Sequence, residues 1–360
     1  MSLKVIDNEI MVIVGPTGSG KTTLLNLICG LLKPDCGSAH VDGADMTTIP
    51  VESRKIGYTF QNPTLFPHMN VYENIVFGLT KKKREVRKET DVEIKKLLDD
   101  LGIAQLTHRH IDGLSGGEMQ KVSLARMLVT KPKIILMDEP LAHLDLLTKR
   151  KLRIELRQVL KRQGVPTICV THFEDDVYAL ADSVCILQNG AMEYTSKLES
   201  LLMKLQNDHS SSSSSSSSSN KNDRTLKLLY NTLSGGQASN YLEGNVLKSE
   251  GGITIFKAGS TTLETLGVHN IGSKVGILIR PEDIILSKEI VKTSARNVVK
   301  AKVMKVTDYD SGIVDVHLVA DRFYLTSRIT REARVDLQIS EDDYVFAIFK
   351  ASSPQVVREE

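Results

Sequence analysis

The chain has 360 residues, of which 41% are hydrophobic, and its formal net charge is +2. That length allows two or three domains with sizeable cores. The nearly neutral charge argues against nucleic acid and against a membrane surface as electrostatic partners. No apolar run approaches the ~20 residues that span a bilayer, and no signal peptide is expected. The four cysteines form no CxxC pair, so reduced, buried thiols are expected.

A glycine-rich loop stands between a predicted strand over 10–14 and a predicted helix over 21–32. Glycines let the backbone curl so that its N–H groups surround an anion, and the helix N-terminus adds positive potential. Lys21 can reach the β- and γ-phosphates of a nucleotide, and the Thr22 hydroxyl can bind Mg²⁺. The sequence therefore predicts a phosphate-binding loop made of Gly15, Pro16, Thr17, Gly18, Ser19, Gly20, Lys21, Thr22 and Thr23.

Strands and helices alternate in the next part of the chain. Strands are predicted over 2–5, 39–42, 56–60, 133–137 and 167–170, and helices over 81–100, 118–130 and 146–162. The runs over 133–137 and 167–170 are short and apolar, as in the interior of a parallel sheet. The alternation predicts an α/β domain that extends to about residue 205.

Two carboxylates end the apolar run that precedes them, Ile134 to Met137. Asp138 is predicted to hold Mg²⁺ through water. Glu139 is placed to polarise the water that attacks the γ-phosphate, so it is the predicted general base.

Three further sites complete the predicted catalytic set. Ser115-Gly116-Gly117 opens a helix, and its hydroxyl and N–H groups form a second anion cradle. Gln61 and His172 each follow a predicted strand, at the edge where parallel sheets bind ligands. We expect Lys21, Glu139 and His172 to act in catalysis, and Thr22, Gln61 and Asp138 to hold the metal.

Together these motifs resemble the ATP-binding-cassette (ABC) ATPases. The matching segments are GPTGSGKTT at 15–23, FQNPTLFPHMNVYENI at 60–75, LSGGE at 114–118, IILMDEP at 134–140, LAHLD at 141–145 and VTHFEDD at 170–176. The resemblance implies a P-loop NTPase domain of α/β class with a helical subdomain. It also implies ATP and Mg²⁺ as the bound groups.

The resemblance further implies a head-to-tail homodimer. Each ATP lies between the phosphate loop of one subunit and the Ser115–Gly117 turn of the other, and Asp145 crosses the interface beside Glu139. The stretch 60–77 resembles the importer version of the family, in which it contacts a short helix of the membrane permease. Two permease subunits, an external binding protein and a peripheral position at the cytoplasmic face of the membrane are therefore expected.

The N-terminal region departs from the family. An upstream strand normally carries an aromatic residue that stacks on adenine, whereas Met1 lies nine residues before the strand at Ile10. This strand region therefore looks truncated. Losing the stacking contact is expected to weaken ATP binding by about 1 kcal/mol.

Ten consecutive serines at 210–219 break the composition. Such a segment buries no apolar area, so 206–225 is predicted to be a flexible linker. The sequence LSGGQ at 233–237 follows it, but no apolar strand ending in Asp-Glu comes after, so a plain loop is expected there.

Alternating apolar and polar residues follow, at 252–256, 275–279 and 314–318. This pattern predicts an all-β regulatory domain with an OB-like barrel, in two parts, 226–290 and 291–360. The segments 293–297 and 347–353 resemble the oxyanion-binding barrel of molybdate and tungstate importers. The side chains expected to bind an oxyanion are Ser294, Arg296, Asn297, Lys350 and Ser352.

The sequence thus predicts the ATP-hydrolysing subunit of an importer for molybdate or tungstate, with oxyanion feedback through the C-terminal domain. Two alternatives stay open. The cargo is sulfate, thiosulfate, a polyamine or a sugar, or the chain is a non-hydrolysing relic that binds nucleotide or oxyanion only. The oxyanion residues have an alternative role as well, since they occur in barrels that bind no ligand.

Overall fold

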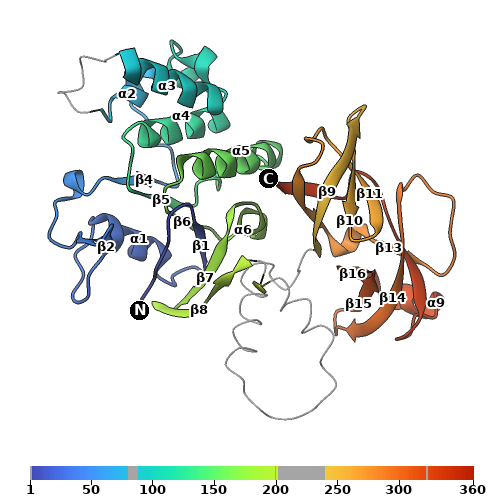
Figure 1. The fold of residues 1–360 in the computed structure, drawn as a ribbon. Coiled ribbons are helices and arrows are strands. Elements are labelled where there is room, and N and C mark those ends of the chain that lie inside the picture. The colour runs from blue at the N-terminus through green and yellow to red at the C-terminus, as the bar shows by residue number, and fades with distance from the viewer. Residues whose placement is uncertain (1, 80–87, 199, 202–239, 322) are drawn as a thin grey trace. The chain divides into compact units, whose positions relative to one another are not determined.

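The computed structural model describes residues 2–79, 88–198, 200–201, 240–321 and 323–360. The chain divides into two compact units, Met1–Lys197 and Leu198–Glu360 (Figure 1). The predicted linker over 206–225 and the LSGGQ segment at 233–237 lie outside the described residues. The domain boundaries predicted at 205 and 290 stay predictions.

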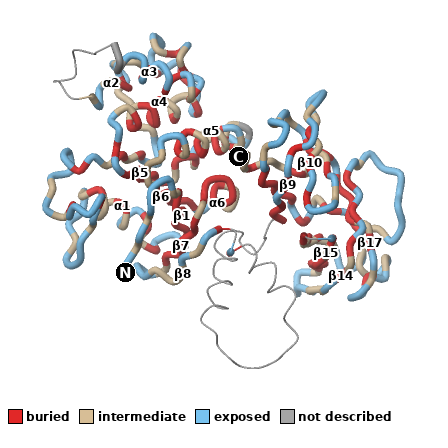
Figure 2. The backbone as a smooth tube through the Cα atoms, viewed as in Figure 1, coloured by how far each residue is buried: buried red, intermediate tan, exposed pale blue. Residues whose placement is uncertain are grey.

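A six-stranded sheet in the order β4-β5-β6-β1-β7-β8 forms the centre of the first unit. Its strands are β4 (Ile56–Thr59), β5 (Ile134–Asp138), β6 (Thr167–Val170), β1 (Ile10–Val14), β7 (Ser183–Gln188) and β8 (Ala191–Lys197). The first five strands are parallel, and only β8 is antiparallel to its neighbour. Every residue of β1, β5 and β6 is buried, as Figure 2 shows for the middle of the sheet. This burial explains why these strands have continuous apolar sequences.

Helices cover the sheet and form a separate group at one end of the unit. They are α1 (Lys21–Cys29), α2 (Val71–Val76), α3 (Lys88–Asp100), α4 (Gly116–Leu128), α5 (Leu146–Gln163) and α6 (Glu174–Leu180). Leu25 and Cys29 of α1 pack with Met11 and Ile13 of β1 in one apolar cluster. Figure 1 shows α2, α3 and α4 gathered beyond the sheet, where α4 contacts β4. This group is a helical subdomain.

Three elements predicted near the N-terminus differ from the structure. Residues 2–5 form no strand, because they join none of the sheet's hydrogen-bonded ladders. The helix predicted over 21–32 ends at Cys29. Gly30 follows it with φ 91°, a left-handed conformation that ends helices, and its N–H donates to Asn26 O. The strand predicted over 39–42 is a two-residue strand β2 (His40–Val41) paired with β3 (Ala44–Asp45).

The parallel direction of β1, β4, β5 and β6 positions the candidate site. The carboxyl ends of these strands share one edge of the sheet, and ligands bind at that edge in open α/β sheets. Gly15 follows β1, Gln61 lies two residues beyond β4, Glu139 follows β5 and His172 lies two residues beyond β6. Residues far apart in the sequence therefore meet at one edge.

Two antiparallel sheets build the second unit. One contains β9 (Asn240–Glu250), β10 (Ile253–Ala258), β11 (Thr261–Leu266), β12 (Lys274–Ile279) and β18 (Gln355–Glu359). The other contains β13 (Ile285–Ser287), β14 (Asn297–Asp308), β15 (Ile313–Ala320), β16 (Phe323–Thr330) and β17 (Tyr344–Phe349). A short helix, α9 (Arg331–Asp336), connects β16 to β17. Both sheets contribute to one apolar core, which includes Phe256 and Phe349. The last strand, β18, pairs with β12, so the chain ends in the first sheet.

Asp182, which lies between α6 and β7, hydrogen-bonds to both β1 and α5. Its carboxylate accepts from the Ile10 amide at 2.8 Å, from Lys161 Nζ at 2.7 Å and from Arg157 Nη2 at 2.8 Å. Burial by itself raises the pKa of this carboxyl, but the Arg157 guanidinium, Lys161 and the Ile10 amide outweigh burial and hold the pKa below its ordinary value.

A depressed carboxyl pKa stabilises the fold above the ordinary pKa, and the contribution disappears as pH falls through the lower, folded value. Asp182→Asn is expected to lower the free energy of unfolding at pH 7 by about 2 kcal/mol. The difference from the wild type should shrink as pH falls below ~4, the ordinary carboxyl pKa, and vanish below the lower, folded pKa. Urea unfolding at a series of pH values measures it. Asp42→Asn, which removes an exposed ion pair with Lys133, is the control and should change little.

Candidate active site

The loop after β1 is shaped by three glycines. A Cβ on Gly15 would lie 2.1 Å from the Leu187 carbonyl oxygen, so no larger residue fits there. Gly18 and Gly20 have φ of 81° and 98°, the left-handed region that side chains disfavour. The loop can therefore curl tightly and turn its backbone N–H groups inward before α1 begins at Lys21.

Lys21 lies at the centre of this curl. Its Nζ donates to Gly15 O at 2.8 Å and to Pro16 O at 3.0 Å. Burial lowers the pKa of Lys21, while Glu139 and Asp138 act in the opposite direction. Ser19 Oγ is buried in the same loop and has no hydrogen-bond partner among the residues that the structure describes. A buried hydroxyl without a partner costs free energy, so the loop suits a ligand that offers acceptor oxygens, as a phosphate does.

Asp138 ends β5 and is buried. Burial raises the pKa of its carboxyl, and hydrogen bonds from Thr22 and Tyr58 oppose that shift. A buried carboxylate beside a hydroxyl suits a hard divalent cation, which takes oxygen ligands. Thr22 and Asp138 therefore lie together, and their oxygens suit Mg²⁺, whose binding here stays a prediction.

Tyr58 was missed by the sequence analysis, because it stands inside an apolar strand and is typical of one. Its hydroxyl donates to Asn26 Oδ1 at 3.4 Å and lies within electrostatic reach of the Asp138 carboxylate. Burial, with the nearby Asp138 carboxylate as the second cause, raises the pKa of Tyr58. The sequence feature that could have indicated this position is a tyrosine three residues before Gln61, in the strand β4 that pairs with β5.

Glu139 is held between two other predicted residues. Its Oε2 accepts from Gln61 Nε2 at 3.2 Å, and its Oε1 lies 2.8 Å from His172 Nδ1. The backbone turns sharply here, since Glu139 has φ 45° and its N–H donates to Val170 O at 2.9 Å. Such left-handed conformations at non-glycine residues are costly and cluster at active sites.

This geometry allows base catalysis on a phosphate ester or anhydride. The Glu139 carboxylate lies beside Asp138 and within the electrostatic reach of Lys21. A general base needs a fixed carboxylate within hydrogen-bond reach of a water molecule. Gln61 and His172 supply that orientation from the neighbouring strands, so the structure brings Gln61, Asp138, Glu139 and His172 to one edge with Lys21.

The Ser115 turn opens α4 with reciprocal hydrogen bonds. Glu118 N–H donates to Ser115 Oγ at 3.3 Å, and the Glu118 carboxylate accepts from Ser115 N–H and Oγ, each at 2.8 Å. These bonds lower the pKa of Glu118, the backbone amide of Ser115 contributing most. Ser115 and Gly116 are exposed, whereas a Cβ on Gly117 would lie 2.6 Å from Thr148 Cγ2. The Ser115 hydroxyl and amide are thus at an exposed turn, where the Glu118 carboxylate holds both.

Asp145 begins the next helix on the same side. Its Oδ1 accepts from the Thr148 amide at 3.1 Å, and its carbonyl accepts from the Lys149 amide at 2.9 Å. Asp145 is exposed and caps α5. Its side chain thus has a structural function within the chain, and its predicted place at a dimer interface stays a prediction.

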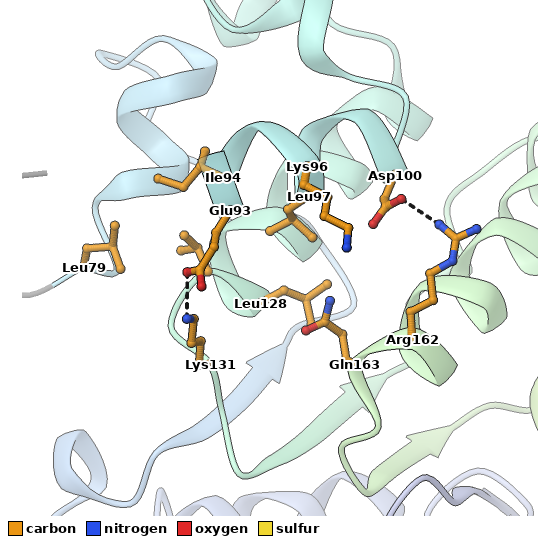
Figure 3. A pocket seen from close by; sticks show the side chains of 11 residues that line it. Leu79, Glu93, Ile94, Lys96, Leu97, Asp100, Leu128, Lys131, Arg162 and Gln163 are labelled. Atoms are coloured by element: carbon orange, nitrogen blue, oxygen red, sulfur yellow. Dashed lines mark hydrogen bonds and ion pairs between the residues drawn. The ribbon is translucent and has the colours of Figure 1, made fainter. Parts of the chain in front are cut away.

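A cavity of about 460 Å³ lies elsewhere in the first unit, between α3, the end of α4 and the end of α5 (Figure 3). None of the predicted site residues lines it. Its floor includes Ile94, Leu97 and Leu128, and the Glu93–Lys131 ion pair borders it at 2.7 Å. A second ion pair, Asp100–Arg162, closes the other side, so four of the charged groups at the rim neutralise one another.

The predicted oxyanion residues gather at one end of two paired strands. Asn297 is opposite Phe349 in the β14–β17 ladder, so Ser294 and Arg296 precede one strand where Lys350 and Ser352 follow the other. Ser294, Arg296, Lys350 and Ser352 are exposed.

Asn297 differs from these four, because it is buried and its amide bonds to the backbone. Its Oδ1 accepts from Glu264 N at 2.7 Å, and its Nδ2 donates to Glu264 O at 2.9 Å and to Lys350 O at 3.4 Å. The Glu264 carboxylate also lies 3.2 Å from Arg296 Nε. An oxyanion at this edge therefore has a carboxylate nearby, which the sequence analysis did not foresee.

Comparisons with known proteins identify the families to which the chain is similar. Residues 1–142 match the family described as ABC transporter, and residues 293–354 match the TOBE domain. The chain is 37% identical over 356 residues to the molybdate/tungstate import ATP-binding protein of Pyrococcus horikoshii, a match that covers 99% of this chain and 94% of that protein. It is 40% identical over 196 residues to the sulfate/thiosulfate import ATP-binding protein of Vibrio cholerae, which covers 54% of this chain and 52% of that protein.

Among solved structures, the chain is similar to a nucleotide-free ATP-binding cassette from an ABC transporter. The match has a TM-score of 0.49 and 30% sequence identity, and it covers 54% of this chain and 83% of that one. Within the described part of the chain, no helix combines the length and the apolar character needed to cross a bilayer.

Proposed function

The chain belongs to the ATP-binding proteins of ABC importers, and on that premise we propose that it hydrolyses ATP to drive uptake of molybdate or tungstate. One observation carries the proposal. Both oxygens of the Glu139 carboxylate are contacted, by Gln61 and by His172, at the same sheet edge as the phosphate-binding loop. A binding module needs the loop alone, whereas an oriented carboxylate beside it is a requirement of hydrolysis.

The chain's own residues have separate tasks in this proposal. The loop 15–23 binds the phosphates of ATP through its amides, the Ser19 hydroxyl and Lys21. Glu139 accepts a proton from the attacking water, and His172 and Gln61 hold the carboxylate and contact the γ-phosphate. Thr22, Gln61 and Asp138 would hold Mg²⁺, which when bound neutralises charge on the phosphate oxygens.

The proposed assembly is a homodimer on two permease subunits. Ser115, Gly116 and Gly117 are the second cradle, which closes on the nucleotide of the other subunit, and Asp145 lies at the same seam. The segment Gln61–Phe77 faces the permease, which places the protein at the cytoplasmic face of the membrane without crossing it. An extracytoplasmic binding protein delivers the oxyanion to that permease. The exposed faces of Ser115 and Gly116 support this arrangement.

Phosphate release by the purified full chain tests the activity. With MgATP the chain is expected to release phosphate in a steady state, and with magnesium removed by a chelator the rate should fall to the background. Nucleotide binding without phosphate release, with and without the permease, would instead support the relic that only binds.

The proposed cargo follows from how much of the chain each relative matches, because the ATPase unit is similar in importers of different cargo. Similarity to the sulfate/thiosulfate protein covers 54% of this chain, whereas similarity to the molybdate/tungstate protein covers 99% and includes the second unit. The exposed side chains of Ser294, Arg296, Lys350 and Ser352 are the proposed oxyanion contacts for feedback.

Calorimetry on the full chain with molybdate, tungstate and sulfate tests the feedback. Heat with molybdate or tungstate that is lost in Lys350→Ala supports it. No heat with either would remove oxyanion feedback while leaving the ATPase proposal intact. Heat with sulfate alone would favour the other cargo.

A further inference from the structure

A buried ion pair joins α5 to the first turn of α6, close in sequence to His172. Arg153 of α5 donates from Nε to Asp176 Oδ1 at 2.6 Å and from Nη1 to Asp175 Oδ2 at 3.0 Å. Arg153 is 2% exposed and Asp176 is 1% exposed. Both charges are thus inside the protein, between α5 and the first turn of α6.

Thr171 connects this pair to the backbone around His172. Its hydroxyl donates to Asp176 Oδ2 at 2.8 Å and accepts from the Phe173 amide at 3.1 Å. Asp176 therefore has both oxygens engaged, one by α5 and one by the residue before His172. Thr171 itself is fully buried, and its amide donates to Ile13 O of β1 at 3.3 Å.

The residue after His172 is also fixed from α5. Lys149 Nζ lies 4.1 Å from the centre of the Phe173 ring, and the His172 and Phe173 rings are 4.0 Å apart. Lys149 and Arg153 are four residues apart, so they share one face of the helix. His172 is exposed, but its neighbours on both sides are held by this face of α5.

We propose that Arg153, Asp176 and Thr171 are positioning residues that hold His172 Nδ1 against the Glu139 carboxylate. The inference rests on the proposed hydrolysis. A buried ion pair is weak evidence for stability, because desolvation offsets much of the attraction. The neighbouring Arg157 already joins α5 to the end of α6, through Leu180 O at 2.6 Å and Asp182 at 2.8 Å. The Arg153 pair, in contrast, is hydrogen-bonded to Thr171, the residue before His172.

The first test is Thr171→Val with Thr167→Val as its matched control. Both threonines are fully buried, Thr167 in β6 and Thr171 just beyond it. Within the described part of the chain, the Thr167 hydroxyl hydrogen-bonds to Val165 O alone, at 3.2 Å. Thr171→Val is expected to lower kcat for ATP hydrolysis roughly 10- to 100-fold while KM for ATP stays within about twofold. Thr167→Val should keep kcat, and urea unfolding of both variants shows how much stability each has lost.

The second test compares Arg153→Lys with Arg157→Lys. Lysine keeps the charge but loses the two-pronged geometry of the guanidinium. If Arg153 positions His172, only Arg153→Lys lowers kcat, although both variants lose stability. Equal kcat in Thr171→Val and Thr167→Val, or in the two lysine variants, would overturn the inference. A wild-type chain without hydrolysis would instead overturn the proposed function on which it rests.

Discussion

Glu139→Gln is expected to reduce ATP hydrolysis at least ~100-fold while leaving ATP binding intact. The amide has the shape of the carboxylate, so contacts with Gln61 and His172 can persist, but an amide does not accept a proton from water. Lys21, which binds the phosphates, and Asp138, which binds the metal, are unchanged, and neither transfers the proton. The expected loss is therefore in kcat, and KM should change much less.

Steady-state phosphate release and equilibrium binding of ATP measure the two quantities separately. Glu93→Gln is the matched control, because Glu93 is an exposed carboxylate paired with Lys131 and remote from the loop. That control should hydrolyse ATP as the wild type does. If Glu139→Gln keeps more than about a tenth of the wild-type rate, Glu139 is not the general base.

The same variant reports on the proposed dimer. When ATP binds but is not hydrolysed, two subunits that share the nucleotide remain associated. Size-exclusion chromatography with ATP is expected to show a larger dimer fraction for Glu139→Gln than for the wild type. Without nucleotide the two should elute alike, since the substitution does not alter the surface charge near Ser115.

The part of the candidate site that lies at the carboxyl ends of the parallel strands was predictable from the sequence. Parallel strands place their carboxyl ends at one edge, so a polar residue after each apolar strand predicts a meeting point. Gln61, Glu139 and His172 meet there, as the hydrogen bonds of the Glu139 carboxylate show. The predicted fold class is confirmed, with an α/β ATPase unit and its helical subdomain followed by a β unit containing the TOBE domain.

Other features depend on contacts that no local pattern predicts. Tyr58 belongs to an apolar strand by its neighbours, and only its pairing with β5 brings its hydroxyl to Asp138. Arg153 and Asp176 are each typical of exposed helix faces, and their burial follows from the packing of α5 on α6. Residues 2–5 alternate like a strand, but none of the strands that the structure describes pairs with them.

In the second unit, too, the sequence predicts where strands lie but not which strands pair. Alternation predicted its strands over 252–256, 275–279 and 314–318, and strands occur at all three places. Alternation does not predict the order of the strands in the sheets, because β18 pairs with β12 across about 80 residues of sequence. Asn297 likewise has the polarity of a ligand-binding residue, yet its amide joins the backbones of Glu264 and Lys350.

Two inactive variants are expected to restore each other's hydrolysis when mixed. Lys21→Ala removes the ammonium group at the centre of the loop. Ser115→Asp combined with Glu118→Gln puts a carboxylate in the second cradle, where it repels phosphate. That pair of changes keeps an N-cap side chain and a single negative charge in the first turn of α4. Each variant alone should hydrolyse ATP at less than about one-hundredth of the wild-type rate.

The rescue follows from where the two cradles meet. If ATP lies between the loop of one subunit and the Ser115 turn of the other, a mixed dimer has one site with both parts intact and one with both parts altered. Mixing should therefore give a rate well above the sum of the separate rates, at chain concentrations that allow dimers to exchange. Glu118→Gln alone is the control and should stay active, since glutamine preserves the capping box. If the mixture is no more active than its components, Lys21 and Ser115 act within one chain, and the head-to-tail arrangement is wrong.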